Sequence, residues 1–337
     1  MNTRVTTQFS PARRQQGFSL VEGMIALTLG VVLLAGTGQI YAQVRQAYRG
    51  QLAQSRIQEN ARYALELISH DLRLSGYFGC NSASKALPAP IANSPLAAMA
   101  VVSGGDDNTG AFADPNPKLS ASLPVTTDPP STLILGTDAV SVQFGDSCAG
   151  KIDAAMTGLD PTGIVSSRNT CGITAGMALV IGDCAKTDVF RAITTGLNSR
   201  GTFAAGYAVG AEIMRFRAYT YFIQANASGQ PSLWRFDNNA AGGANNPVEL
   251  VEGIEDMQVA YGVDSGTDGS ANYYMDADAV GANWAKVVAV RVTITARSLE
   301  DNLTLAPATV TYNGASVTDH SLRKSFTATV GLRNFLL

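Results

Sequence analysis

An apolar run of about 20 residues begins at Phe18 and is broken only by Ser19, Glu22, Thr28, Thr37 and glycines. An α-helix of that length crosses a hydrocarbon core of about 30 Å. A secretory signal peptide would instead show an apolar core of about 7–15 residues followed by a small-residue cleavage site. We therefore predict a membrane-spanning helix over residues 18–38.

From Gln39 to about Leu74 the pattern becomes amphipathic and no proline interrupts it. Apolar positions recur at steps of three and four residues, as on one face of a helix; they are Ile57, Ala61, Ala64, Leu65, Ile68 and Leu72. Charged residues fill the other faces. The pattern predicts one helix from Phe18 to about Leu74, ended by Gly76, whose second half (39–75) lays its apolar stripe on a globular head (76–337).

The head alternates between turn-forming and strand-forming sequence. Residues 81–130 are rich in Ala, Ser, Pro, Gly and Asp, which predicts a long loop region with short strands. Apolar and polar side chains alternate along Val287–Arg297, as in an antiparallel strand with one solvated face. Further strands are predicted at 133–135, 177–181, 188–193, 211–223, 232–236 and 325–333. The expected fold class is α+β, with a long helix packed on an antiparallel sheet.

Composition supports a folded head and argues against a nucleic-acid partner. Hydrophobic residues make up 46% of the 337 residues and charged residues 15%, so the chain can bury a core. The net charge is −3, and beyond the N-terminal segment no cluster of Lys and Arg forms a basic patch. Arg4, Arg13 and Arg14 precede the apolar run. The positive-inside rule therefore places the N-terminus in the cytoplasm and the bulk of the chain outside.

An exported head implies an oxidising compartment for the four cysteines, Cys80, Cys148, Cys171 and Cys184. An even number favours two disulfides. A metal site is the poorer alternative, because the sequence has no CxxC spacing and its two histidines are His70 and His320. The sequence does not choose among the three pairings. We favour Cys171–Cys184 with Cys80–Cys148, because the first of these closes a short local loop.

Glu22 is the anomaly of the apolar run. A carboxylate inside a membrane span costs about 3 kcal/mol or more, so it needs a partner or a function. No cationic side chain lies within the run. A cut after Gly17 would create a cation, the α-amino group of Phe18, one helical turn from Glu22. In a packed filament the amine of a neighbouring subunit would serve equally well.

The order Gly17, Phe18, Glu22 followed by an aliphatic run resembles the class III signal of type IV pilins and pseudopilins. The resemblance implies that residues 1–17 are a leader, that a prepilin peptidase cuts between Gly17 and Phe18, and that Phe18 is N-methylated. The segment RIQENARYALELISHDLRLSGYFGC resembles the stalk-to-head junction of minor pilins of the PilW family. The later segments RFRAYTYFIQ, PSLWRFD, VELVEGIEDMQVAYGVD, WAKVVAVRVTITARS and SFTATVGLRNFLL resemble that family in the same order.

This resemblance implies a minor pilin that takes part in priming the assembly of a type IV pilus and sits at its tip. The implied partners are other minor pilins, the major pilin, the prepilin peptidase and the inner-membrane assembly platform. The protein would wait in the inner membrane and then appear on the pilus at the cell surface. The alternatives are a type II secretion pseudopilin, or an adhesin or hydrolase carried on a pilin-like anchor.

Candidate chemistry in the head is sparse. The loop Asp264–Asp278 places Asp264 and Asp268 at positions 1 and 5 of a calcium-binding loop. Gly266 and Met275 occupy positions 3 and 12, where oxygen ligands belong, so we expect a solvated hairpin loop with calcium binding as the alternative. For the aromatic residues Tyr273, Tyr274 and Trp284, sheet packing is favoured over a sugar-binding surface. The sequence contains no G-x-S-x-G, H-E-x-x-H or Walker motif, and we expect no enzymatic activity.

Overall fold

The computed structural model describes residues 17–80, 101–105, 134, 136–156, 171–174, 176–192, 206–238, 246–266, 268–304, 306–312 and 315–335. The chain divides into two compact units, Met1–Gln51 and Leu52–Leu337. The boundary falls inside the first helix, α1 (Leu20–Leu74). Each unit is described separately.

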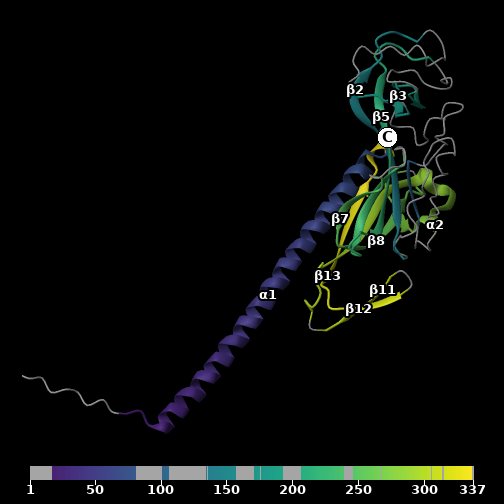
Figure 1. The fold of residues 1–337 in the computed structure, drawn as a ribbon. Helices are drawn as coiled ribbons and strands as arrows, with labels where there is room; N and C mark the ends of the chain where they lie inside the picture. The colour runs from purple at the N-terminus through teal and green to yellow at the C-terminus, as the bar shows by residue number, and fades with distance from the viewer. Residues whose placement is uncertain are drawn as a thin grey trace, which may run out of the picture. The chain divides into compact units, whose positions relative to one another are not determined.

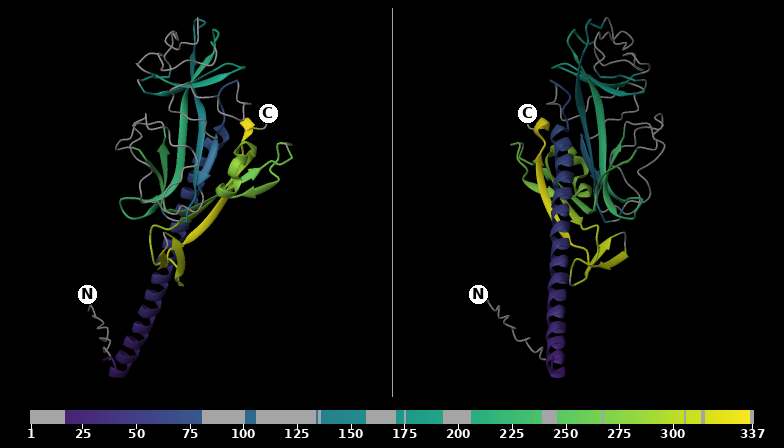
Figure 2. Two further views of the ribbon diagram at one scale, coloured as in Figure 1. Left: turned by 90° about the vertical axis from the view of Figure 1, so that its right-hand side faces the viewer. Right: turned by 60° about the vertical axis from the view of Figure 1, so that its left-hand side comes forward.

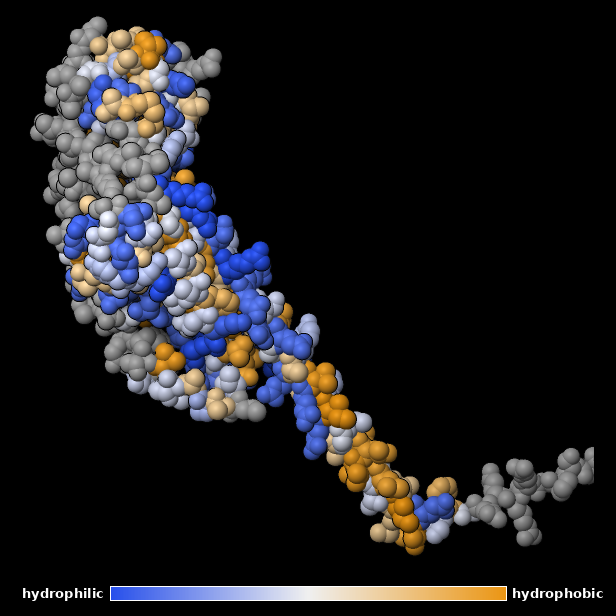
Figure 3. Space-filling model, turned by 180° about the vertical axis from the view of Figure 1, so that it is seen from behind, coloured by the Kyte–Doolittle hydropathy of each residue, from blue (hydrophilic) through white to orange (hydrophobic). Residues whose placement is uncertain are grey.

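The first unit consists of the N-terminal part of α1, about 48 Å long at 1.5 Å per residue. Between Leu20 and Gly38 most positions around the helix are apolar and their large side chains are exposed; the orange surface of Figure 3 shows those on the face in view. A helix that is apolar all round is buried in a large core or in a membrane. By length and composition, α1 is the one helix in the described residues that meets the requirement for crossing a membrane.

In the second unit, α1 buries one stripe of small and branched side chains. The buried apolar residues are Ala53, Ile57, Ala61, Ala64, Ile68 and Leu72, and Leu65 packs half-buried beside them. The predicted stripe is therefore confirmed. Ala61 and Ala64 are completely buried. Their single methyl groups let the helix axis come close to the sheets, which a larger side chain would prevent.

The helix ends at the predicted position and is capped from far along the chain. Gly76 has a φ of 76°, in the left-handed region that glycine adopts most easily. The Asn334 side-chain amide donates to the Ser75 carbonyl at 2.9 Å, with the Leu74 carbonyl 3.5 Å away. The carbonyl groups at the end of α1 thus accept hydrogen bonds from Asn334, which follows the last strand of the chain.

Seven strands of the second unit form one sheet (Figures 1 and 2). They are β1 (Val102–Gly105), β2 (Ala139–Lys151), β3 (Ala178–Gly182), β4 (Thr187–Arg191), β5 (Glu212–Ala225), β6 (Pro231–Asp237) and β7 (Val248–Glu252). The long strand β5 pairs along one side with β2. On its other side the first half of β5 pairs with β3 and the second half with β6. The strand β5 therefore connects the pair β3–β4 with the pair β6–β7.

A second sheet has the order β13-β10-β8-β9, with every pair antiparallel. Its strands are β8 (Ile254–Val263), β9 (Tyr273–Met275), β10 (Val287–Arg297) and β13 (Arg323–Gly331). The strands β11 (Ala308–Tyr312) and β12 (Ala315–Asp319) form a separate hairpin before β13. The short helices α2 (Ala277–Val280), η2 (Gly281–Lys286) and η3 (Arg333–Phe335) complete the described elements.

Most of the predicted strands are present. β10 has the predicted bounds, and its valines and Ile294 are buried while Arg291 is exposed. The predictions at 177–181, 188–193, 211–223, 232–236 and 325–333 correspond to β3, β4, β5, β6 and β13. At 133–135, Ile134 is the one described residue and it belongs to no strand. The region 81–130 lies outside the described residues except for 101–105, where β1 forms.

One main core unites the second part of α1 with side chains from both sheets. It includes Ile68 and Leu72 of α1, Val140 of β2, Tyr221 of β5 and Val292 of β10. A smaller core around Leu179, Phe190 and Ile213 lies where β3, β4 and the start of β5 meet. The α+β fold class, a long helix on antiparallel sheets, is confirmed.

Replacing Ile68 by Ala removes a completely buried side chain from the helix stripe. We expect the free energy of unfolding of the second unit to fall by about 2–4 kcal/mol, through lost burial and a residual cavity. Urea unfolding of the full chain in detergent, followed by the fluorescence of Trp234 and Trp284, measures the change. The control Tyr63→Ala alters an exposed position of the same helix and should change stability by less than about 0.5 kcal/mol; equal effects would contradict the packing role.

Candidate functional site

The residues at the predicted processing site lie just before α1. Gly17 to Ser19 have no regular structure, and α1 begins at Leu20. The Ser19 carbonyl accepts the Gly23 N–H at 3.1 Å, the first bond of the helix, which makes Ser19 the capping residue. Phe18 is 79% exposed. The helix thus begins two residues after the predicted start at Phe18. The pairing of Glu22 with the Phe18 amine of a cut chain stays a prediction.

The hydroxyl groups of the apolar stretch are satisfied locally. Thr28 donates to the Met24 and Ile25 carbonyls at 3.1 and 2.9 Å. Thr37 donates to the Leu34 carbonyl at 3.0 Å. These bonds let a helix carry threonine in an apolar environment without a partner helix.

Glu22 differs from these threonines. It lies in the first turn of α1, and in the described part of the chain its carboxylate has no hydrogen-bond or ion-pair partner. The positive end of the helix dipole stabilises a carboxylate there by about 0.3–1 kcal/mol. The cost of a charge in a membrane span is about 3 kcal/mol, so the dipole alone is too weak to offset it. A cation from outside the helix is therefore needed to stabilise the Glu22 carboxylate within a membrane.

A buried polar contact fixes the second part of α1 to β5. The Tyr221 hydroxyl donates to the Asp71 carboxylate at 2.5 Å, and both residues are buried. Burial, and then the charge of Asp71, raises the pKa of Tyr221 well above its ordinary value, so the phenol stays protonated. His70 Nδ1 lies 3.0 Å from the other Asp71 oxygen, and the His70 side chain is largely exposed.

All four cysteines form disulfides, but the pairing differs from the favoured one. Cys80 pairs with Cys184 and Cys148 with Cys171, at Cα separations of 4.7 and 5.0 Å. Proximity in sequence was misleading, because the extended strand β3 runs between Cys171 and Cys184 and carries them apart. The far end of β3 instead reaches the segment that follows α1: a side chain on Gly182 would lie 3.2 Å from the Phe78 carbonyl.

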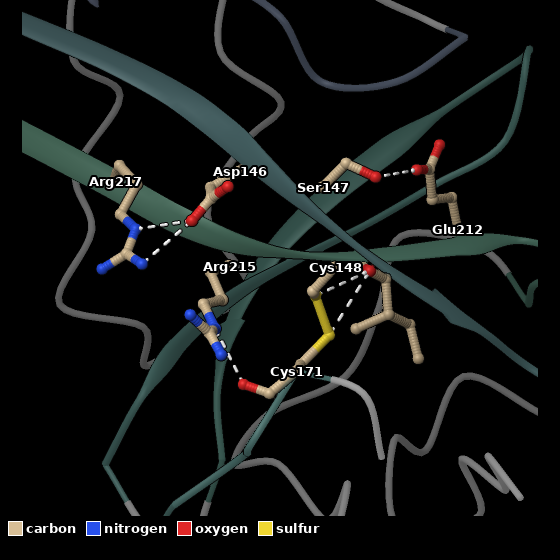
Figure 4. Close-up of a disulfide and its surroundings, with 8 residues drawn as sticks. Asp146, Ser147, Cys148, Cys171, Glu212, Arg215 and Arg217 are labelled. Carbon is tan, nitrogen blue, oxygen red and sulfur yellow. Dashed lines mark hydrogen bonds and ion pairs between the residues drawn. A yellow bond between two sulfur atoms is a disulfide. The ribbon is translucent and has the colours of Figure 1, made fainter. Parts of the chain in front are cut away.

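The Cys148–Cys171 disulfide lies against β5 (Figure 4). Its sulfur atoms are 3.5 and 3.8 Å from the Ile213 carbonyl oxygen. Arg215 Nε donates to the Cys171 carbonyl at 2.7 Å, which fixes the chain on the other side of the bridge. Close by, Arg217 and Asp146 form an ion pair across β5 and β2 at 2.9 Å. This corner of the head is held by covalent and polar links together.

The candidate calcium-binding residues accept hydrogen bonds from the backbone of their own loop. Asp264 Oδ2 accepts the Gly269 N–H at 2.8 Å, and Asp268 Oδ1 accepts the Ser270 N–H at 2.9 Å. Asn272 Oδ1 accepts the N–H groups of Ser265 and Gly266 at 2.7 and 3.1 Å. In the described residues no group of three or more His, Cys, Asp or Glu side chains is placed to hold a metal ion. The expected solvated loop, and calcium binding as its alternative, both stay untested.

The aromatic residues near this loop are largely used in packing. Trp284 meets Tyr261 edge to face, with ring centroids 4.8 Å apart. The Arg291 guanidinium lies 3.9 Å from the ring centroid of Tyr274 on the outer face of the sheet. Tyr273 is 43% exposed at the edge strand β9. The packing role expected for Trp284 is thus observed.

Charged residues that the sequence analysis did not identify link β8, β12 and β13. The buried Glu255 accepts two hydrogen bonds from Arg323, at 2.6 and 3.0 Å. Arg323 also donates twice to Asp319, both times at 2.7 Å. Arg297 lies 3.5 Å from Glu255 and balances the charge of the group. Hydrogen bonding to Arg323 holds the pKa of Asp319 well below its usual range.

Because the Asp319 pKa is lower in the folded than in the unfolded chain, its contribution to stability is present above about pH 4 and is lost as the pH falls further. We expect Asp319→Asn to lower the free energy of unfolding at pH 7 by about 1–3 kcal/mol. It should also flatten the loss of stability between about pH 4 and pH 2. Urea unfolding across this pH range measures both effects. The exposed Asp278→Asn is the control, and an acid slope unchanged by Asp319→Asn would contradict this assignment.

Cysteine substitution tests the pairing directly. Cys80→Ser should leave a single reactive thiol at Cys184, because the other disulfide stays closed. Alkylation of the native protein followed by peptide mass mapping identifies the labelled residue. The matched variant Cys148→Ser should expose Cys171 instead. Labelling of Cys148 in the Cys80→Ser protein would instead support the pairing favoured from the sequence, Cys80–Cys148.

Comparison with solved structures found a likeness to a type IV-like pilin, TTHA1219, from Thermus thermophilus. The identity is 16% and the TM-score 0.21, over 48% of this chain and 86% of that one. So low a TM-score carries no argument, and the fold class follows from the strand pairing described above. A search of curated proteins gave no match.

Two protein-family models match different parts of the chain. Residues 12–38 match the prokaryotic N-terminal methylation motif, and these residues include Gly17, Phe18 and Glu22. Residues 220–334 match the family of type IV pilus-assembly protein W, PilW, and this range runs from within β5 to Asn334. The chain therefore carries the N-terminal methylation motif, which marks a class III prepilin signal, and residues 220–334 of its head match the PilW family model.

Proposed function

We propose that this protein is a minor pilin that takes part in priming the assembly of a type IV pilus and occupies a place at its tip. The observation that carries the proposal is Glu22, which has no partner in the described residues and lies in the first turn of an apolar helix, four residues after Phe18 and within a matched methylation motif. The PilW match in the head supports a pilus rather than a secretion system.

The proposed maturation step supplies the missing cation. A prepilin peptidase hydrolyses the Gly17–Phe18 peptide bond, so Gly17 leaves as a carboxylate and Phe18 keeps a protonated α-amino group. N-methylation of that amine preserves its positive charge. The amine, on the same chain or on a neighbouring subunit, then pairs with Glu22 in a low-dielectric environment, where the attraction is much stronger than in water.

The remaining assignments follow from this arrangement. The apolar part of α1 anchors the uncut chain in the inner membrane, with the leader in the cytoplasm and the head in the periplasm. Its partners there are the prepilin peptidase, the assembly platform, the major pilin and other minor pilins. The head then contributes contacts rather than catalysis, and the assembled protein appears at the cell surface.

Three variants at the N-terminus test the proposal in cells that make pili. Gly17→Val should block cleavage, whereas Glu22→Ala should permit it and lower incorporation into fibres by at least about tenfold, through loss of the ion pair. The control Glu59→Ala alters an exposed glutamate further along α1 and should change neither. Intact mass of the protein measures cleavage and methylation, and its recovery in sheared pili measures incorporation. A chain that still begins at Met1 in cells with normal fibres would overturn the proposal.

A further inference from the structure

β13 forms an edge of the four-stranded sheet and pairs with β10 alone among the described strands. The pairing covers nine residues, from Arg323 to Gly331, without a shift in register. The strand contains neither proline nor a bulge, which are common devices that prevent an edge from pairing with another chain.

The register shows which backbone groups of β13 point away from the sheet. The Leu332 N–H donates to the Val288 carbonyl, and the Ser298 N–H donates to the Leu322 carbonyl, both at 2.8 Å. Bonded pairs alternate with unbonded pairs along an antiparallel ladder, so the even-numbered residues of β13 bond to β10. The backbone N–H and C=O groups of Ser325, Thr327 and Thr329 therefore point outward along the free edge.

These three residues are also exposed as side chains, and they make no backbone hydrogen bond to any described segment beyond β13 and β10. Two of their hydroxyls bond to neighbours on β10: Thr327 to Thr293 and Ser325 to Thr295, each at 2.9 Å. The edge thus has a regular register, and its outward backbone groups are available to a further strand. We propose that β13 receives an extended strand from another protein subunit, which adds a fifth strand to this sheet.

The side chains around the edge define the chemistry of that strand. Phe326 and Ala328 are half-buried on the face that packs against the core, so alternate residues of the added strand should be apolar. On the other face the hydroxyls of Ser325, Thr327 and Thr329 call for small polar residues. The added strand therefore alternates between apolar and small polar side chains.

Positive charge at both ends of the edge favours a partner strand that carries acidic residues. Lys324 is exposed at the start of β13, and its Nζ lies 5.5 Å from the ring centroid of Phe326, with no carboxylate partner in the described residues. Arg333 is exposed just beyond the other end and likewise has no ion pair there. A matching strand therefore carries a carboxylate toward each end of its pairing with β13.

The same charges argue against a second copy of β13 as the occupant. In an antiparallel pair of β13 strands, Lys324 of one copy would approach the end that carries Arg333 of the other. Like charges would then meet at both ends of the ladder, which is unfavourable. The inference deepens the proposed function and rests on it, because assembly beside other subunits is what supplies the strand.

The test removes one outward N–H without changing the bonds to β10. In Thr327→Pro the lost N–H is the one that points away from the sheet, and proline is tolerated at such edge positions. The control Thr327→Val keeps the N–H and suits a strand. A photoreactive amino acid at Ser325 reports the partner in living cells, and the same group at Thr295 of the neighbouring strand is the control position.

We expect Ser325 to crosslink to an extended acidic segment with the alternation described above, mapped by mass spectrometry of the crosslinked peptides. Thr327→Val should retain the crosslink, Thr327→Pro should lower its yield at least about tenfold, and Lys324→Glu should lower it as well. Crosslinking to a second copy of β13, equal yields in the proline and valine variants, or no crosslink at Ser325 would overturn the inference.

Two further measurements keep the outcomes distinct. Closed disulfides and an unchanged melting temperature establish that Thr327→Pro is folded; if it is not, Lys324→Glu, which leaves the backbone unaltered, decides the question. Intact mass reports leader removal separately. A chain that is cleaved and incorporated but gives no crosslink disproves the edge pairing alone, whereas an uncut chain in piliated cells disproves the proposed function.

Discussion

The close packing of α1 against the two sheets is the contact on which the second unit depends. Ala61, Ala64 and Ile68 are completely buried, and the main core includes side chains from the helix and from both sheets. Neither sheet buries its inner face without the helix, because a helix stripe and a sheet face must be covered by another layer. The narrow stripe of alanines therefore sets how near the layers come, and larger residues such as Ile57 and Leu72 fill the space at either side.

Polar and covalent links then fix this packing at separate points. Tyr221 of β5 bonds to Asp71 of α1, and the Glu255–Arg323–Asp319 group joins β8 to the last strand. Buried charges and phenols are costly unless they are paired, so each of these contacts favours one arrangement of the strands over its alternatives. The disulfide Cys80–Cys184 adds a covalent link between the segment after α1 and the turn between β3 and β4. The apolar core supplies most of the stabilisation, and these links restrict it to one topology.

Local periodicity predicted much of this fold. The helix stripe at Ile57–Leu72 and the strand Val287–Arg297 follow from spacings of about 3.6 and two residues, which depend only on neighbouring positions. The disulfide pairing was not predictable in this way, because it depends on the direction in which β3 runs. The contact of Asp71 with Tyr221, 150 residues apart, left no local signal either. Glu22 could be identified from sequence since its anomaly is local, a charge within an apolar run, whereas the start of α1 at Leu20 depends on Ser19 as its cap.

If the head is exported as proposed, the cap on α1 has a consequence for the timing of folding. Asn334 lies 259 positions after Ser75, whose carbonyl it binds, and it follows directly on β13. A nascent chain that has crossed the membrane only as far as β10 has the helix and most strands but an open helix terminus. The carbonyl groups at the helix end therefore gain the Asn334 hydrogen bond only after nearly all of the head has been translocated. An arrested export intermediate would lack this bond at the junction of helix and head.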